Sequence, residues 1–434
     1  MGSPTAPAEP EPSSNRSESD DATDGDNPIS WKRTLYALWF AQLLAIVGFS
    51  LRVPFLPFFL EDLGTTSTSA QALWAGMINA GGAGVMAISA PIWGVVADRY
   101  GRKPMVLRSM FAATITISLM GFATAPWHLL GLRFIEGAFS GTVTASTALV
   151  ASTAPKERTG FALGMIQTAV FSGASLGPLI GGVLASQIGY RPTFWVASGM
   201  MLTGGMIVLF LVQERFQPQV HDPSAKKGFR ANFDVLAGRL MLTMVLVMLV
   251  IRFAASAVQP ILPLFVGTLS SASAGDQAAL AGLILGVAGL TSAISSVILG
   301  RLGDRLGHRR ILFWCALAGG LLYLPMLAVH SAWQLAVLQA LFGVAAGGLI
   351  PSANAIVVNV TAPERRGVVF GLMAGSASLG GFFGPLAGAG LAAGFGFGVA
   401  FFSTGMALLL LALAIYLTVK PSSPELRMPV SEPA

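Results

Sequence analysis

GVVADRYGRK (residues 94–103) lies between two long apolar stretches, and the related segment GRLGDRLGHR (residues 300–309) lies between two others. The first glycine, the Asp-Arg pair, the second glycine and the final base recur in the same order, 206 positions later. A charged turn that repeats at a fixed offset indicates that the chain consists of two similar halves. Duplicated halves of this kind are a common plan among membrane transporters.

The composition of the 434 residues is that of a membrane protein. Hydrophobic residues make up 54% of the chain and charged residues 11%, whereas soluble domains carry about 25% charged residues. Apolar runs of about 20 residues, long enough to cross the hydrocarbon core as helices, recur throughout. A large soluble helical protein is not expected, because the polar residues are too few to cover its surface. The runs are also continuous and lack the alternation of membrane β-strands.

We expect an all-α integral membrane protein with twelve transmembrane helices. The spans are predicted at residues 33–60, 74–97, 104–124, 128–151, 160–188, 193–213, 238–268, 278–300, 310–329, 332–358, 367–393 and 397–419.

The positive charges predict how the spans are oriented. Of the 26 Lys and Arg residues, 22 lie in alternate turns and in the two tails. Because cytoplasmic turns carry the basic residues, both termini are predicted to be cytoplasmic and the number of spans to be even. The formal net charge of +6 then reflects topology, and no nucleic-acid partner is expected.

Five segments follow from this organisation. Residues 1–29 form an acidic tail, predicted to be disordered and not to be a cleavable signal. Residues 30–213 form a first six-helix bundle, residues 214–236 a cytoplasmic linker, residues 237–420 a second six-helix bundle and residues 421–434 a second tail.

The repeat extends into two further pairs of spans. In the first and seventh spans, Ser50, Pro54 and Pro57 recur 206 positions later as Ser256, Pro260 and Pro263. In the fifth and eleventh spans, Gly160, Gly164, Gly177, Pro178 and Gly181 recur 207 positions later as Gly367, Gly371, Gly384, Pro385 and Gly388. Two halves of six spans enter the membrane from the same side, so an axis along the membrane normal would relate them, with a cavity between.

On these motifs the chain resembles the major facilitator superfamily, specifically its twelve-span drug:proton antiporters, over about residues 30–420. Residues 94–103 resemble the superfamily's motif between spans 2 and 3. Residues 133–137 (RFIEG) resemble its fourth-span motif, with Glu136 in place of a glutamine. Gly48, Pro54 and Pro57 resemble the first-span pattern of this branch. The resemblance implies two bundles that expose a central cavity alternately to either side of the membrane.

Residues 173–182 (GASLGPLIGG) resemble the fifth-span motif that marks antiporters within the superfamily. Its members here are Gly173, Gly177, Pro178, Gly181 and Gly182. The glycines permit tight packing and the proline removes a backbone donor, so plain helix packing is a compatible interpretation. The resemblance implies export more than uptake.

The repeated cassettes are interpreted as conformational latches. Asp98 ends the second span as an anion, which a neighbouring helix N-terminus or an arginine would stabilise. Pseudo-symmetry suggests the start of span 11 as the partner of Asp98 and the start of span 5 as the partner of Asp304. The latch residues are Gly94, Asp98, Arg99, Gly101, Arg102, Asp304 and Arg305, with Arg158, Arg365 and Arg366 on the facing helices. The alternative is a basic turn that only fixes topology.

Four charged residues are predicted inside spans: Arg52, Arg133, Glu136 and Arg252. Each costs about 2.5–3.5 kcal/mol at the helix centre, so each is expected to face a cavity or a partner. Arg133 and Glu136 are three residues apart, on one helix face, and can pair. Glu136 is the only acid placed in any span, and Arg133 with Glu136 is predicted to couple transport to protons. The alternative is a static ion pair.

The resemblance implies that spans 1, 4, 7 and 10 line the cavity. The candidate substrate contacts are Gln42, Phe49, Arg52, Asn79, Gln167, Arg252, Phe253, Gln259 and Asn354. The net intramembrane charge of +2 favours anionic, zwitterionic or neutral amphipathic substrates over lipophilic cations. A second possibility for Arg52 is a place near the outer surface, paired with Glu61 or Asp62.

No phosphate-binding loop of the ATPase type occurs, and four scattered histidines with one cysteine give no metal-site spacing. We therefore expect no enzyme activity and no cofactor, only a proton-driven monomer that exports small amphipathic molecules, drugs or lipid-like compounds, across a bacterial inner membrane. One alternative is a proton-coupled uptake carrier or facilitator for a metabolite such as an organic anion. The other is a receptor or scaffold on the same fold.

Overall fold

The computed structural model describes residues 2, 31–155, 158–214, 239–361 and 366–419. Over these residues the chain is helical and contains no strand. Ten of the described helical segments are long and apolar enough to cross a membrane. The predicted all-α class is thereby confirmed. The predicted linker beyond Glu214 and the two tails, apart from Gly2, lie outside the described residues.

The first and seventh predicted spans are each broken at the same place. α1 (Trp31–Ser50) is followed by a turn at residues 51–55 and then α2 (Leu56–Asp62), and α10 (Arg239–Val258) is followed by α11 (Leu262–Leu269). Pro57 and Pro263 lie in the first turn of the second piece, where a missing N–H costs little. Both halves therefore have a break in the helix next to the paired prolines.

The remaining long helices also come in matched pairs. α3 (Thr68–Tyr100) and α12 (Ala274–Leu306) each have 33 residues, and α7 (Thr159–Ile188) and α15 (Arg366–Phe395) each have 30. α8 (Tyr190–Leu211) matches α16 (Phe397–Thr418) with 22 residues each.

The glycines of the repeated cassettes have a conformational role. α4 (Lys103–Met120) and α13 (His308–Tyr323) start directly after turns at Gly101 and Gly307, whose φ angles are 96° and 94°. L-residues with side chains rarely adopt such angles, whereas glycine does so freely. Glycine therefore allows the chain to leave one long helix and enter the next within one or two residues.

The fourth and tenth predicted spans differ. The tenth is one helix, α14 (Ala332–Val360), after a short 3-10 turn, η4 (Pro325–Ala328). The fourth consists of α5 (Pro126–Phe139) and α6 (Thr142–Thr153), separated at Ser140 and Gly141. Neither α5 nor α6 alone is long enough to span a membrane, and α4 is also outside the ten apolar segments.

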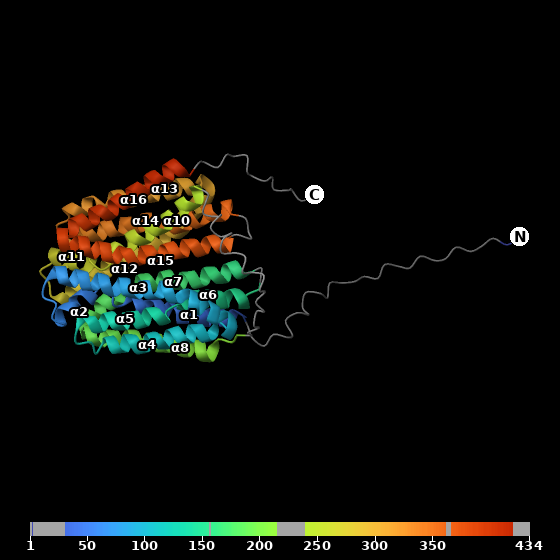
Figure 1. Ribbon diagram of the computed structural model, residues 1–434, viewed down its shortest axis with the longest axis horizontal. Helices are drawn as coiled ribbons and strands as arrows, with labels where there is room; N and C mark the ends of the chain where they lie inside the picture. The colour runs from blue at the N-terminus through green and yellow to red at the C-terminus, as the bar shows by residue number, and fades with distance from the viewer. Residues whose placement is uncertain (1, 3–30, 156–157, 215–238, 362–365, 420–434) are drawn as a thin grey trace.

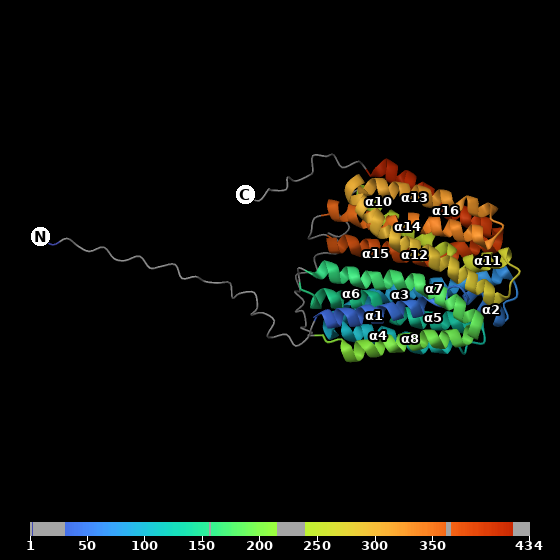
Figure 2. The ribbon, with the colours of Figure 1, turned by 180° about the vertical axis from the view of Figure 1, so that it is seen from behind.

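The long helices lie side by side, with their axes in roughly the same direction (Figures 1 and 2). One hydrophobic cluster is built mainly from residues 35–212 and another mainly from residues 241–419. α3 and α7 contact α15 and α12 between these clusters, whereas α4 with α8 and α13 with α16 lie at the two outer edges. α1 begins and α16 ends at the same end of the helices, here named the terminal end; the opposite end is the distal end.

Glycine contacts show where the two clusters touch. Near the distal end, a Cβ at Gly76 of α3 would lie 2.5 Å from Ala389 Cβ of α15, and a Cβ at Gly282 of α12 would collide with the Pro178 carbonyl of α7. Toward the terminal end, a Cβ at Gly94, Gly300, Gly164 or Gly371 would meet nothing within 4 Å. The described contacts between the clusters are therefore tight near the distal end, and we interpret the space beside these four glycines as an opening at the terminal end.

Gly282→Val tests this closure. The branched side chain would push α12 away from α7, so the closed distal end should lose stability relative to an arrangement open at that end. We expect a cysteine at Ser292 to be labelled about tenfold faster from the distal side by a membrane-impermeant maleimide, which corresponds to a shift of ~1.4 kcal/mol. Gly199→Val, where a Cβ meets nothing within 4 Å, is the matched control. Unchanged labelling in the Gly282 variant would show that this crossing does not hold the distal end closed.

Candidate functional site

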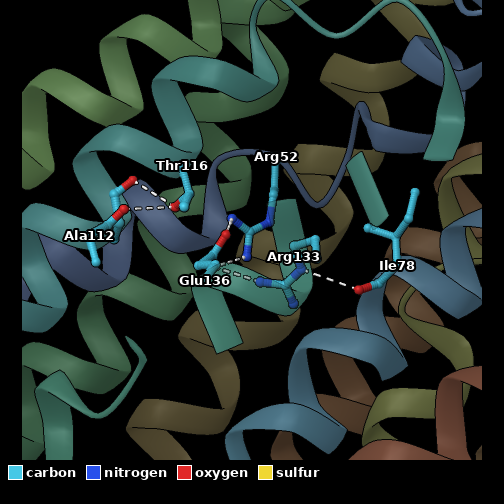
Figure 3. Close-up of polar contacts among 7 residues, drawn as sticks. Arg52, Ile78, Ala112, Thr116, Arg133 and Glu136 are labelled. Atoms are coloured by element: carbon cyan, nitrogen blue, oxygen red, sulfur yellow. Dashed lines mark hydrogen bonds and ion pairs between the residues drawn. The ribbon is translucent and has the colours of Figure 1, made fainter. Parts of the chain in front are cut away.

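Glu136 is bound by two arginines from different parts of the first half (Figure 3). Arg52, in the turn between α1 and α2, donates from Nη1 to Glu136 Oε2 at 3.1 Å and from Nη2 to Oε1 at 3.0 Å. Arg133, one turn before Glu136 on α5, donates from Nη1 to Oε1 at 2.6 Å. The Glu136 side chain is only 4% exposed. These three residues are named the charge triad.

The charge triad has one carboxylate and two guanidiniums, so it carries a net charge of +1. Removing a single partner from a buried ion pair is costly because it leaves a charge without compensation. The second cation is partly satisfied by backbone: Arg133 Nε donates to the Ile78 carbonyl of α3 at 3.3 Å. Gly82 makes room for this side chain, since a Cβ there would lie 2.7 Å from Arg133 Cζ. The triad therefore joins α3, α5 and the turn after α1.

The carbonyls at the end of α5 accept hydrogen bonds from side chains of α3 and α4. Ser89 Oγ donates to the Gly137 carbonyl at 3.2 Å and Trp93 Nε1 to the Ala138 carbonyl at 2.6 Å. Arg108 Nη2 donates to the carbonyls of Phe139 and Ser140 at 3.2 and 3.1 Å. These bonds replace the intrahelical partners that the last turn of a helix lacks. They let the helix end inside the protein, immediately after Glu136.

Arg108 is additionally held by an aromatic ring. Its guanidinium carbon lies 3.5 Å from the centroid of the Trp93 ring, which is close for a cation over an aromatic face. Gly141, with φ 130°, lies in the break between α5 and α6. A Cβ added to Gly141 would lie 3.7 Å from Arg108 Nη2. The roles of Ser89, Trp93 and Arg108 were not predicted from the sequence. The Ser-Gly pair inside an apolar run was the available signal, because such pairs mark turns and helix ends.

A cavity of about 660 Å³ lies beside α3, mainly within the second half. Its polar lining residues are Arg252, Ser256, Gln259, Ser292, Tyr323, Gln339 and Ser378, and the first half contributes Ala83 and Met86. No acid from the described part of the chain lines the cavity. Arg252 is exposed into it and takes part in none of the ion pairs found among the described residues. The site thus offers one cation, several neutral hydrogen-bonding groups and a largely apolar wall.

Comparison with known proteins identifies the family. The family model described as the Major Facilitator Superfamily matches residues 38–275 and 244–433. The chain belongs to the major facilitator superfamily. Among curated relatives, the multidrug resistance protein MdtG of Serratia proteamaculans is 38% identical over 393 residues, covering 89% of this chain and 93% of that protein. The protein of the same name from Enterobacter lignolyticus is 37% identical, covering 91% and 94%.

Solved structures of the superfamily share the fold. A bacterial homologue of the human lysosomal transporter Spinster, in an inward-facing, unoccupied conformation, aligns with a TM-score of 0.73 and 16% identity, covering 89% of this chain and 96% of the other. The human organic anion transporter MFSD10 aligns with a TM-score of 0.66 and 19% identity, covering 89% and 99%. A transporter of small molecules, not an enzyme, is the function that the family indicates.

Two of the predicted substrate contacts, Arg252 and Gln259, line the cavity. Arg52 does not: it belongs to the charge triad, and the possibility that it pairs with Glu61 or Asp62 is wrong because Glu136 takes its guanidinium. The expectation that Arg133 and Glu136 pair is confirmed.

The other predicted contacts lie away from the cavity lining. Gln42 is buried and accepts from Ser146 Oγ at 3.1 Å, and Asn79 donates to the carbonyl of Ala75 in its own helix at 2.9 Å. Phe49 lies near Arg52, with 5.9 Å between ring centroid and guanidinium carbon. The remaining three are Gln167, which is exposed, and Phe253 and Asn354, which are half-buried.

The latch residues lie at the open terminal end. Gly94, Asp98 and Arg99 are exposed on the last turns of α3, and Arg305 is exposed on α12. Asp304, with a side chain 73% exposed, accepts from His308 Nε2 at 3.1 Å, and it makes no ion pair with Arg158 among the described residues. Arg365 and the side chain of Arg366 lie outside the described residues. The latch contacts therefore stay predictions.

The glycines of the antiporter motif pack α7 against two neighbours. Added Cβ atoms at Gly173 and Gly177 would collide with Ile46 and Ser50 of α1, and one at Gly181 would collide with the Leu51 carbonyl. On the other face, Gly182 and Pro178 meet Ala278 and Gly282 of α12. The packing interpretation of this motif is confirmed, and the motif links the turn that carries Arg52 to the second half.

Variants of the charge triad test its energetics. Glu136→Gln leaves two neighbouring guanidiniums without a carboxylate, and we expect it to lower the free energy of unfolding by about 3–5 kcal/mol. Arg52→Met leaves a neutral pair and should cost less. Adding Arg52→Met to Glu136→Gln removes one of the two unpaired cations, so the double variant should be more stable than Glu136→Gln alone. Thermal unfolding of the purified variants in detergent measures all three. Strictly additive losses would contradict a coupled triad.

Proposed function

We propose that this superfamily member is a proton-driven exporter of amphipathic small molecules. In this proposal twelve transmembrane helices form two six-helix bundles, α5 and α6 together make the fourth span, and α4 makes the third. The terminal end, which carries most of the basic residues, faces the cytoplasm of a bacterial inner membrane. The transporter acts as a monomer without ATP or another cofactor. The relatives named multidrug resistance protein support export of drugs.

The observation that carries the proposal is the combination of an open terminal end with a buried charge triad. A cavity of about 660 Å³ is large enough for a drug-sized molecule, and in this proposal it is reached from the open end. Substrate would therefore enter from the cytoplasm. The charge triad supplies the carboxylate of Glu136, whose protonation would weaken its ion pairs within the first half.

The coupling follows from the contacts of Glu136. As a carboxylate it holds Arg52, and with it the turn between α1 and α2. Protonation of Glu136 from the outside would weaken both ion pairs and release that turn. Loss of the proton to the cytoplasm would restore the arrangement seen here. Such a cycle moves substrate only if substrate and proton stabilise different states of the transporter.

The cavity favours a particular substrate class. Arg252 is its one charged lining residue, and the remaining polar groups are neutral. Neutral, zwitterionic or anionic amphiphiles fit this lining better than lipophilic cations, which would meet a cation without a balancing acid. The apolar wall gives little directional constraint, so loose specificity is expected.

Uptake of an organic anion is the second candidate. The same Arg252 without an acidic partner favours it, because an inward-directed carrier of anions needs such a group. The glycine-rich packing of α7 is expected in either case and does not separate the two. The direction of transport under an imposed proton gradient does.

Proton coupling is tested with Glu136→Gln in proteoliposomes. The probe is anilinonaphthalene sulfonate, and accumulation is followed with and without a pH gradient. We expect gradient-driven accumulation to fall at least about tenfold, because glutamine cannot exchange a proton, while exchange of probe without a gradient continues.

Glu61→Gln is the matched control, since it removes an exposed acid at the far end of α2. It should retain the gradient dependence. Full gradient dependence in Glu136→Gln would show that this carboxylate is structural only. Accumulation in the uptake direction by the native protein would replace export with the second candidate.

Arg252→Gln tests the substrate class. A hydrogen bond to a charged group contributes about 1.5–3 kcal/mol, so affinity for anilinonaphthalene sulfonate should fall by about 10- to 150-fold. Affinity for its uncharged analogue phenylnaphthylamine should stay unchanged, and ethidium should bind more tightly once the cation is gone. Arg252→Lys should restore part of the loss, and Arg301→Gln, at the terminal end of α12, is the control. Equal losses for the charged and uncharged probes would contradict an anion contact at Arg252.

A further inference from the structure

A second, smaller hollow lies on the outer edge of the molecule, remote from the cavity. Its volume is about 160 Å³ and it is lined by Arg309, Arg310, Phe313, Trp314 and Tyr416. We name these five residues the α13–α16 groove. They come from the first two turns of α13 and the last turn of α16, at the terminal end. Both views show these two helices at the edge farthest from α4 and α8 (Figures 1 and 2).

Among the residues that the structure describes, the groove has two cations and no acid. Arg309 Nη2 donates to the Tyr416 carbonyl at 3.0 Å, which fixes one guanidinium beside the hollow. Arg310 is exposed, and no ion pair within the described ranges includes either arginine. Several N–H donors of the two fork-shaped side chains remain available, and such forks match phosphate oxygens.

The corresponding place in the first half already holds an anion. There Lys103 Nζ donates to the Leu209 carbonyl at 2.9 Å, which repeats the Arg309–Tyr416 contact 206 and 207 positions earlier. Beside it, the Glu214 carboxylate accepts from the backbone N–H groups of Arg102 and Lys103 at 2.7–3.0 Å. At the same offsets after Glu214 the second half has Lys420 and Pro421. The sequence thus supplies a carboxylate to one copy and a base or a proline to the other.

Two exposed aromatic side chains indicate where the groove lies in the membrane. Trp314 and Tyr416 are 61% and 62% exposed on the lipid-facing edge, within two turns of the helix ends. Trp and Tyr favour the level of the lipid headgroups, where one part of the ring system is apolar and another forms hydrogen bonds. The arginines beside them then lie at the level of the phosphates.

We propose that the α13–α16 groove binds the phosphate headgroup of an anionic phospholipid from the leaflet at the terminal end. The two guanidiniums bind the phosphate, and Trp314 and Tyr416 contact the region where the acyl chains begin. The volume fits a headgroup phosphate, whereas the 660 Å³ cavity fits a whole amphipathic molecule. This lipid takes the place that the Glu214 carboxylate fills in the first half. The proposal does not depend on what the cavity transports.

Native mass spectrometry of the full chain, released from detergent with added lipid, tests the site. The probes are phosphatidylglycerol, which is anionic, and phosphatidylcholine, which has no net charge. We expect the native protein to bind phosphatidylglycerol preferentially. Removing one arginine near a headgroup should weaken that binding roughly fivefold, and removing both about thirtyfold. The variants are Arg310→Gln and the pair Arg309→Gln with Arg310→Gln.

The control pair Lys32→Gln with Arg301→Gln removes the same two charges from exposed positions at the same end. It should bind phosphatidylglycerol as the native protein does. If the control pair lost as much phosphatidylglycerol binding as the groove variants, the binding would depend only on the protein's overall charge. That result would overturn the proposal. So would equal binding of phosphatidylcholine. If millimolar inorganic phosphate displaces the bound lipid completely, the groove is a site for free anions and the lipid assignment fails.

Discussion

The carboxylate of Glu136 is almost completely removed from solvent, so it needs positively charged partners. The need to place these partners beside Glu136 constrains the arrangement of the first half. One guanidinium comes from its own helix and the other from a turn 84 residues earlier. To bring them together, α1 must end at Ser50, α3 must offer the glycine at position 82, and α5 must stop within one turn of Glu136. The hydrophobic pattern alone explains none of these three features.

The two halves divide the charged and polar groups between them. The first half holds the charge triad and contributes only Ala83 and Met86 to the cavity, while the second half supplies its polar lining. α7 connects these regions, because its glycines pack on the turn with Arg52 on one side and on α12, a wall of the cavity, on the other. A structural change at the charge triad can therefore be passed to the cavity through a single helix, α7.

Much of the fold could be predicted from the sequence, because the repeats constrain it twice. The bends before Pro57 and Pro263, the turns at Gly101 and Gly307 and the pair Arg133–Glu136 all follow from local spacing. Arg52 as a partner of Glu136 could not be predicted, since no periodicity links residues on different spans. The break in the fourth span was also missed, because its freed carbonyls are satisfied by Ser89, Trp93 and Arg108 from other helices.

The break at Ser140–Gly141 has a consequence for how a duplicated protein moves. Its counterpart, α14, is one helix of 29 residues in which Pro351 removes a single backbone donor. In the first half the backbone bonds between α5 and α6 are already absent, and side chains hold the free carbonyls, so the angle between the two pieces can change without further loss of helical hydrogen bonds. The two similar halves thus differ in where the helix backbone is interrupted, and the symmetry of the fold does not extend to the places where it can bend.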